Sequence, residues 1–332
     1  MLTIILIPTG LIAVAVIFLA ILFIPVFNQP KPMTFGVTFS EPFAKWLGLD
    51  AKKAYTEILD DLQVKDLRLI AYWDEIEPQE GVYDFSSLDW QIAEAEKRGA
   101  NIILAIGQKV PRWPECHYPD WTKNFKKEDF QEKILTLLRE TVNRYKDKQV
   151  IKMWQVENEP LVFFFGKCPF LPDRSFLKQE ISLVRGIDSR PTLVTDSGEL
   201  STWLWTSGLG DYFGTTMYRV VWNPVIGFFS YDYIFSPAFY RLKAFLNGLT
   251  PAKVIISELQ AESWGENGQL ATLPLEKLRK SMDSARLKKN IDFASRTGFK
   301  ETYLWGAEYW YWLKEKKGDD SLWQIAKGLW NK

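Results

Sequence analysis

Histidine and cysteine are nearly absent from this sequence. One histidine, His117, and two cysteines occur among 332 residues. Zinc sites built on several histidines, including the HExxH type, are therefore excluded, and a histidine-based catalytic triad could use only His117. Two cysteines cannot form a structural zinc site on their own. Hydrolytic chemistry in this chain must therefore rely on carboxylates.

The chain also lacks an excess of charge of either sign. Lys and Arg number 41, as do Asp and Glu, so no global field attracts nucleic acid or anionic lipid. Aromatic side chains are abundant by contrast, with 15 Trp, 13 Tyr and 22 Phe. Such side chains suit flat ligands with polar edges, such as sugars. We therefore expect a carbohydrate partner and no nucleic acid.

The N-terminal segment contains no charged residue. Met1–Phe27 is apolar throughout, and at ~1.5 Å per residue a helix of this length spans the ~30 Å hydrocarbon core of a membrane. It lacks the basic start and the small-residue cleavage site of a signal peptide. We therefore expect one transmembrane anchor over residues 1–28, followed by a stiff linker over residues 29–32. Lys31 weakly favours a cytoplasmic body.

Eight apolar runs alternate with helix-patterned stretches over residues 33–332. Their continuous apolar character is typical of parallel strands that are buried on both faces. Eight alternations predict an α/β fold, namely a (β/α)8 TIM barrel. Together with the anchor, the predicted architecture is this barrel preceded by one N-terminal transmembrane helix. No GxGxxG motif follows the first run, which argues against an open doubly wound sheet. The predicted strands are Met33–Ser40, Asp66–Trp73, Asn101–Gly107, Val150–Val156, Pro191–Asp196, Tyr212–Tyr218, Lys253–Glu258 and Glu301–Trp305. The predicted helices include Ala51–Gln63, Ser87–Arg98, Phe130–Tyr145, Arg174–Ile187, Leu275–Thr297 and a short one around Ser201–Thr206.

Carboxylates end two of these buried runs. The fourth run finishes with the glutamates of Glu157-Asn158-Glu159, and the seventh finishes at Glu258. Chemistry in such barrels takes place at the C-terminal ends of the strands, and an unpaired buried charge there is costly. Two carboxylates across the barrel mouth are what retaining glycoside hydrolysis requires, since one attacks the anomeric carbon and the other protonates the leaving oxygen.

Four segments carry a family resemblance. WQVENEP (154–160) resembles the Asn-Glu-Pro strand-4 motif of the glycoside hydrolase clan of (β/α)8 barrels that includes cellulases, xylanases and β-galactosidases. WDEIEPQEGVYDF (73–85) resembles the stretch of the clan after strand 2. VIISELQAESW (254–264) resembles its nucleophile strand, and YLWGAEYW (303–310) its strand-8 tryptophan segment. The resemblance covers nearly all of residues 33–332.

The resemblance implies a role for each matching residue. Glu159 is the expected general acid/base and Glu258 the expected nucleophile. Asn158 would bind the sugar 2-hydroxyl, Tyr218 would orient the nucleophile and keep it ionised, and Trp305 would be the floor on which the sugar stacks. The implied reaction is double displacement at an O-glycosidic bond, β bonds being favoured, in a poly- or oligosaccharide, without metal or cofactor.

Further side chains near these motifs are candidates for contact with the substrate, and each also has an alternative role. Glu262 is the alternative nucleophile, but Glu258 directly ends the apolar run, so we expect Glu262 to contact substrate hydroxyls. Trp73 and Trp264 could line a sugar cleft, although a single Trp more often serves packing. Glu157, two residues before the expected acid/base, competes for the inward face, and we expect it to be a partner inside the site.

The chain departs from the pattern of the clan at two strand ends. Many cellulase-like members carry an Arg at the end of strand 2 and a His at the end of strand 3. Here those places read Tyr72-Trp73 and Gly107-Gln108, and Arg68 lies in the middle of its strand. This departure argues against a typical cellulase and leaves the sugar open.

The two cysteines fall in the loops after the third and fourth strands. These loops are neighbours on the catalytic face of a barrel, which favours a Cys116–Cys168 disulfide over two free thiols. A disulfide would indicate a body outside the cytoplasm, against the signal from Lys31, and we expect an extracytoplasmic catalytic domain. His117 lies in the same loop, where we expect it at the surface or the rim.

Two other function classes remain open. A membrane-tethered glycan-binding protein could keep the aromatic cleft without turnover, although both carboxylates are intact. A carboxylate–metal enzyme would need three or more acidic ligands at strand ends, to which only Asp196 and Glu199 could add.

Overall fold

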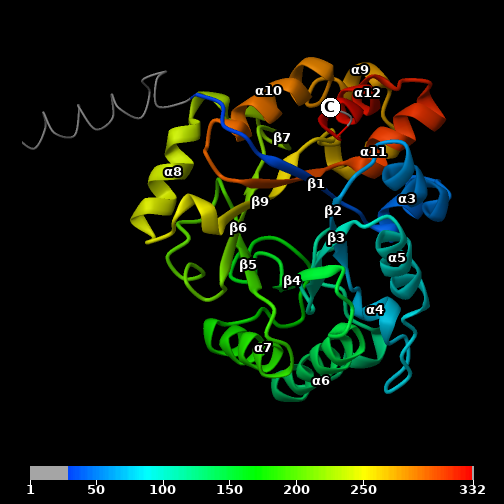
Figure 1. Cartoon of the computed structure of the whole chain (residues 1–332), viewed down its shortest axis with the longest axis vertical. Helices are drawn as coiled ribbons and strands as arrows, with labels where there is room; N and C mark the ends of the chain where they lie inside the picture. The colour runs from blue at the N-terminus through cyan, green and yellow to red at the C-terminus, as the bar shows by residue number, and fades with distance from the viewer. Residues whose placement is uncertain (1–28, 331–332) are drawn as a thin grey trace, which may run out of the picture.

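Eight parallel strands close into a ring in the computed structural model, which describes residues 29–330 (Figure 1). Each strand overlaps one of the eight predicted runs, so the (β/α)8 prediction is confirmed. In ring order the strands are β1 (Thr34–Thr38), β10 (Glu301–Trp305), β9 (Val254–Gln260), β6 (Tyr212–Met217), β5 (Thr192–Asp196), β4 (Ile151–Val156), β3 (Asn101–Ile106) and β2 (Asp66–Ile70).

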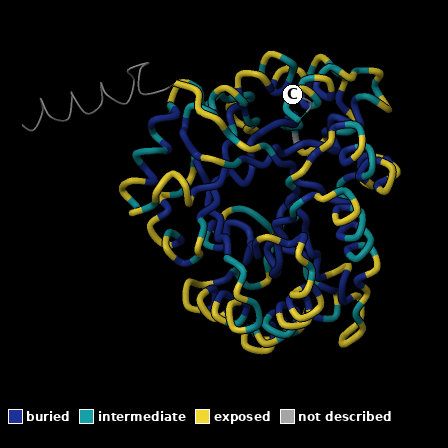
Figure 2. Tube along the Cα trace, viewed as in Figure 1, coloured by how far each residue is buried: buried dark blue, intermediate teal, exposed yellow. Residues whose placement is uncertain are grey.

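Helices surround this ring, and the exposed residues lie mainly on the outer side of the molecule (Figure 2). In α7, for example, Phe176, Leu177, Ile181 and Val184 recur at helical spacing and are all buried. The helices are α2 (Glu41–Trp46), α3 (Ala51–Asp60), α4 (Trp73–Ile76), α5 (Ser86–Lys97), α6 (Lys127–Tyr145), α7 (Arg174–Ile187), α8 (Pro237–Leu246), α9 (Leu275–Leu278), α10 (Ser284–Ser295), α11 (Ala307–Trp312) and α12 (Ser321–Trp330). Shorter turns are the 3₁₀ segments η2 (Asp120–Thr122), η3 (Tyr231–Tyr233), η4 (Pro251–Lys253), η5 (Glu266–Gly268) and η6 (Leu270–Thr272), and the π segment η7 (Leu313–Lys317).

Two helix predictions need correction. The helix predicted over Leu275–Thr297 is two helices, α9 and α10, because the side chain of Asp283 caps the second by accepting a hydrogen bond from Arg286 N. The segment around Ser201–Thr206 forms turns, and no helix crosses between β5 and β6. A two-stranded antiparallel hairpin, β7 (Val220–Asn223) with β8 (Gly227–Ser230), was not predicted and follows β6.

Within residues 29–330, no helix combines the length and the apolar character that crossing a membrane would need. The anchor predicted over residues 1–28 lies outside the described residues.

Candidate active site

Glu159 follows the end of β4 in an unusual backbone conformation. Glu157 and Glu159 have φ angles of 59° and 45°, a region that residues other than glycine seldom adopt. The turn is fixed from both sides, because Glu157 N donates to Ile106 O at 2.9 Å and Glu159 N donates to Thr195 Oγ1 at 2.9 Å. Such strain persists where the surroundings over-determine it, often at functional sites.

Glu258 lies in β9 and is held by two donors. Its Oε1 is 2.9 Å from Nη1 of Arg68, and its Oε2 accepts a hydrogen bond of 2.9 Å from the Tyr218 hydroxyl. Burial and the nearby Glu258 raise the pKa of Tyr218 well above its usual value, so the phenol keeps the proton that it donates. Glu258 is 4% exposed, so both contacts are shielded from solvent.

Arg68 is a site residue that the sequence analysis did not assign. It lies within β2, where it pairs in register with the inward-facing Ile103, and its side chain is fully buried inside the barrel. Many clan members carry an arginine at the end of strand 2. In this chain Arg68 reaches the candidate site from the middle of that strand. A charge in the apolar run D-L-R-L-I was the available signal, because a buried guanidinium requires partners.

The side chain of Asn158 is locked in one orientation. Its Oδ1 accepts hydrogen bonds from Arg68 Nη2 at 2.7 Å, Gln155 Nε2 at 3.2 Å and Thr195 Oγ1 at 3.2 Å. The Nδ2 group therefore points the other way, and it donates to none of the described residues. This leaves the amide free to donate to a ligand.

The carboxyl group of Glu159 has no cationic partner among residues 29–330. Glu159 is 6% exposed, and the hydrogen bond that its carboxyl makes within this part of the chain is from Thr216 Oγ1 at 3.3 Å. Burial, reinforced by the charges of Glu115 and Glu258, raises the pKa of Glu159 well above its usual value. A carboxyl whose pKa is raised in this way keeps its proton to higher pH than an ordinary glutamate and can act as a general acid.

Trp305 and Glu262 meet at the ends of β10 and β9. The indole Nε1 of Trp305 donates to Glu262 Oε1 at 2.9 Å, and Arg112 Nη1 donates to the same oxygen at 2.5 Å. Burial raises the pKa of Glu262 to about 7 although Arg112 opposes this. Glu262 Oε2 is buried and has no hydrogen-bond partner among the described residues. A side chain on Gly306 (φ 144°) would lie 2.8 Å from Glu262 Cβ, so glycine is required there.

Arg112 also covers part of the expected sugar platform. Its guanidinium carbon lies 4.1 Å from the ring centroid of Trp305 and 3.7 Å from that of Phe43, and its Nη2 is 3.2 Å from Glu308 Oε2. Arg112 belongs to the loop after β3 and thus spans the barrel mouth to the ends of β9 and β10. One face of Trp305 is therefore occupied, and the ring is 7% exposed.

The two candidate tryptophans have different positions. Trp264 is half-buried, and its ring meets edge-on, at 5.4 Å, the ring of Tyr218, whose hydroxyl donates to Glu258. Trp73 is fully buried in α4, donates to Glu77 Oε2 at 2.8 Å and packs against Trp121. The suggestion that Trp73 lines a sugar cleft therefore needs correction, because this ring belongs to the core.

Glu157 faces away from the other two glutamates. Its carboxylate accepts hydrogen bonds from the backbone N–H groups of Gln108 at 2.9 Å and Lys109 at 2.6 Å. A side chain on Gly107 (φ 129°) would lie 2.4 Å from Glu157 Oε1, which explains the glycine at the end of β3. Burial raises the pKa of Glu157 to about 7. Glu157 therefore fixes the loop after β3 and is not a partner inside the site.

Cys116 and Cys168 form a disulfide with a Cα–Cα distance of 5.1 Å, joining the loops after β3 and β4. His117, expected at the surface or rim, is instead buried. Its ring packs 4.5 Å from the Tyr72 ring, and its Nε2 lies 3.2 Å from Arg112 O.

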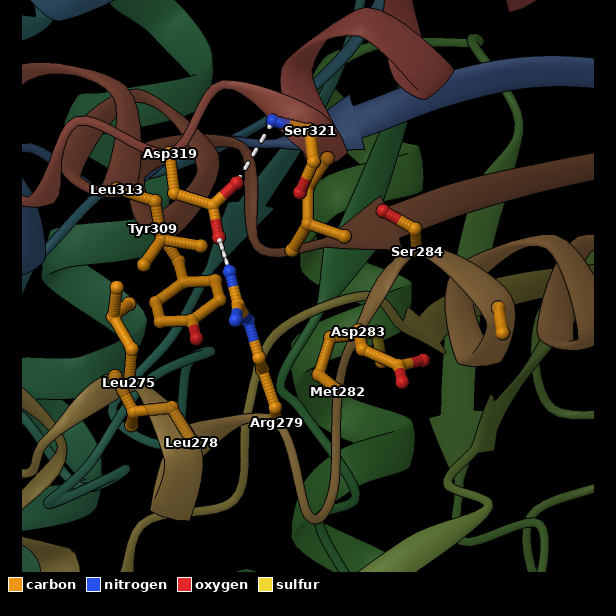
Figure 3. Close-up of a pocket in the computed structure, with 12 residues that line it drawn as sticks. Leu275, Leu278, Arg279, Met282, Asp283, Ser284, Tyr309, Leu313, Asp319 and Ser321 are labelled. Atoms are coloured by element: carbon orange, nitrogen blue, oxygen red, sulfur yellow. Dashed lines mark hydrogen bonds and ion pairs between the residues drawn. The ribbon is translucent and has the colours of Figure 1, made fainter.

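The described residues hold no group of three or more His, Cys, Asp or Glu side chains that could bind a metal. Glu199, a possible ligand by sequence, instead accepts hydrogen bonds from Tyr218 N at 3.0 Å and from Tyr240. A cavity of about 410 Å³ lies among α9, α10 and α11 (Figure 3), where Arg279 Nη2 is 2.8 Å from Asp319 Oδ2. None of the candidate site residues lines it.

Sequence comparison matches residues 50–180 to the beta-galactosidase family Glyco_hydro_42. The beta-galactosidase LacZ of Lactobacillus acidophilus is 25% identical over 167 residues, which cover 43% of this chain and 24% of that protein. The beta-galactosidase BgaA of Clostridium cellulovorans is 25% identical over 167 residues, which cover 44% of this chain and 25% of that protein. This chain thus spans about a quarter of the length of the curated relatives it matches.

Solved structures resemble the barrel at low sequence identity. The structure of GH5_18 from Bifidobacterium longum has a TM-score of 0.58 at 12% identity, and the match covers 83% of this chain and 69% of that one. Xylanase 10B from Thermotoga petrophila, in complex with xylobiose, has a TM-score of 0.52 at 15% identity, and the match covers 85% and 83%. At these identities the likeness shows the fold alone. The chain therefore has the barrel fold of these proteins and matches the beta-galactosidase family over residues 50–180, which confirms the resemblance to the glycoside hydrolase clan that its motifs predict.

Proposed function

We propose that this chain is a retaining glycoside hydrolase that cleaves β-O-glycosidic bonds of a poly- or oligosaccharide. The observation that carries the proposal is that two glutamates, one after β4 and one in β9, have carboxyl groups with different partners. Glu258 receives a cation and a phenol donor, which suit an ionised nucleophile. Glu159 receives no cation, and its raised pKa suits a general acid.

The proposed reaction has two steps. Glu258 attacks the anomeric carbon while Glu159 gives its proton to the leaving oxygen, which forms a glycosyl-enzyme. The negative charge of Glu258 is then lost, so Glu159 can act as the base that activates water for the second displacement. Asn158 Nδ2, which donates to none of the described residues, would bind a sugar hydroxyl, and the Glu262 side chain would contact another, with Trp264 as an aromatic wall.

The comparisons support a β-linked substrate without identifying the sugar. The relatives that match in sequence are named beta-galactosidases, and a structural neighbour is a xylanase with bound xylobiose. A screen of aryl β-glycosides that includes galactosides, xylosides and mannosides, together with polysaccharides, therefore tests the proposal. Hydrolysis with retention at the anomeric carbon is the expected result.

Two substitutions then assign the roles. Glu258→Ala should abolish turnover of every substrate, whereas Glu159→Ala should spare activated aryl glycosides, whose leaving group needs no protonation. Azide should accelerate the Glu159→Ala enzyme and yield a β-glycosyl azide. Azide rescue of Glu258→Ala to an α-azide, with no effect on Glu159→Ala, would reverse the assignment. Sugar binding without turnover in the unaltered protein would favour the glycan-binding alternative.

We also propose that residues 1–28 anchor the protein in a membrane, with the barrel on the extracytoplasmic side. The uncharged sequence of Met1–Phe27 supports the first part. The Cys116–Cys168 disulfide supports the second, because such bonds persist in oxidising compartments.

A further inference from the structure

The loop after β3 carries a third acidic side chain toward the site. Glu115 lies in a tight turn in which its N–H donates to Arg112 O at 2.7 Å and its carbonyl accepts from Val110 N at 2.8 Å. The next residue is Cys116 of the disulfide, and Lys167 N donates to Pro114 O at 3.0 Å. The turn is thus fastened on both sides of Glu115 to the loop after β4.

Lys109 connects this turn to the expected acid/base. Its Nζ lies 3.1 Å from Glu115 Oε2 and donates to the backbone carbonyl of Glu159 at 2.9 Å. Its own carbonyl accepts a hydrogen bond from Asn158 N. The Lys109 side chain is fully buried, and that of Glu115 is 20% exposed. The Lys109 ammonium group therefore bridges the Glu115 carboxylate and the backbone carbonyl of Glu159.

We propose that Glu115 is a positioning residue that keeps the proton on Glu159, and that the Cys116–Cys168 disulfide holds it in place for this task. The inference rests on the proposed function of Glu159 as a general acid. Glu115 has a cation at 3.1 Å, whereas the Glu159 carboxyl has, among the residues that the structure describes, the Thr216 hydroxyl as its partner. When one proton is available to the two carboxyls, it therefore resides on Glu159.

The charges around Glu159 also favour a proton on Glu159 over one on Glu115. After burial, the charge of Glu115 is the largest contribution that raises the pKa of Glu159, ahead of that of Glu258, while Lys109 opposes both. In the glycosyl-enzyme the charge of Glu258 is lost, and Glu115 remains as the acidic neighbour of Glu159 on the β3 side. Burial raises the pKa of Glu115 as well, but Lys109 at 3.1 Å opposes this and favours its charged form. The titratable groups that face Glu159 are Glu115 and Lys109 after β3, Asp196 at β5, Tyr218 after β6, Lys243 in α8 and Glu258 in β9.

Titration of Glu159 itself gives a test that does not depend on turnover. In protein labelled with ¹³C at the glutamate Cδ, the Glu159 resonance can be assigned by its loss in Glu159→Gln. In Glu115→Gln, its midpoint should fall by about one pH unit, because Lys109 is then unopposed. The double variant Cys116→Ser/Cys168→Ser should lower the Glu159 midpoint by a smaller amount, because Glu115 is kept but is no longer held in place. Asp120→Asn, which removes an exposed charge from the same β3–α6 connection, should leave it unchanged.

The kinetics should follow the titration. The basic limb of the pH profile of kcat/KM should move down with the midpoint in Glu115→Gln for substrates with poor leaving groups, but not for activated aryl glycosides. If Glu115→Gln does not fold, Glu115→Asp, which draws the carboxylate back, should give a smaller fall. An unchanged Glu159 midpoint in the folded variant would overturn the inference, even in an active hydrolase. A shifted midpoint in a protein that hydrolyses nothing would overturn only the proposed function.

Discussion

The guanidinium of Arg68 bonds Glu258 and Asn158 at the same time. Its Nη1 lies 2.9 Å from Glu258 Oε1 and its Nη2 donates to Asn158 Oδ1 at 2.7 Å, while its Nε donates to Gln155 Oε1 at 2.7 Å. One side chain from β2 thus fixes the expected nucleophile on β9 and the amide after β4. The planar fork of arginine makes this possible, and lysine could not reproduce it.

Arg68→Met is expected to lower kcat/KM about 10²–10³-fold, because Glu258, the proposed nucleophile, and Asn158 lose their shared donor. It should also lower the free energy of unfolding by about 3–5 kcal/mol, since the Glu258 carboxylate is left buried without its cation. Steady-state kinetics and urea unfolding measure the two effects.

The double variant Arg68→Met/Glu258→Gln provides the control. It removes both charges, so much of the lost stability should return while the enzyme stays inactive. If Arg68→Met alone keeps the activity of the unaltered protein, Arg68 is not needed to hold Glu258 in its proposed role.

The eight strands could be predicted because each is a buried run whose apolar character is local in the sequence. Arg68 was missed because its importance depends on contacts with β4 and β9, which are far away along the chain. Trp73 was overvalued for the same reason, since its neighbours Trp121 and Phe130 come from the next strand–helix unit. The orientation of Glu157 depends on two left-handed backbone angles, which alternation along a strand cannot reveal.

Two tryptophans should separate substrate binding from stability. Trp264→Ala is expected to raise KM about 5–10-fold, because an aromatic contact beside Tyr218 is worth about 1 kcal/mol. Trp73→Phe should leave KM unchanged, but it should lower the free energy of unfolding by about 1–3 kcal/mol through the loss of the hydrogen bond to Glu77 and of packing. The reverse pattern would show that Trp73 contacts the sugar.

The N-terminal segment makes a prediction about fractionation. Because Met1–Phe27 is uncharged and lacks a cleavage site, the protein should stay in the membrane fraction after a high-salt wash, with residues 1–28 still attached. A mature N-terminus near Gln29–Met33 would instead identify a signal peptide. Removal of residues 1–30 should release a folded, soluble barrel in either case, which circular dichroism and gel filtration can check.

Glu157 and Glu180 should make the stability of the barrel depend on pH. Glu180, in α7, is fully buried, and when both groups are ionised its carboxylate oxygens have no hydrogen-bond donor among the described residues. Burial and the neighbouring Glu157 raise the pKa of Glu180 well above its usual value, and burial raises that of Glu157 to about 7. When Glu180 is protonated, it can share a hydrogen bond with Glu157.

Since both folded-state pKa values are raised, the folded state binds these protons more tightly than the unfolded state. Below pH ~4.5 both groups are protonated in either state, and the pair does not lower the free energy of unfolding. As the pH rises through about 7, the pair lowers it increasingly. Glu180→Gln, which mimics the protonated form, should gain about 1–3 kcal/mol relative to the unaltered protein between pH 5 and pH 8 in urea unfolding. Glu140→Gln, at an exposed position of α6, should gain nothing. Equal pH dependence in Glu180→Gln and the unaltered protein would show that the two carboxyls do not share a proton.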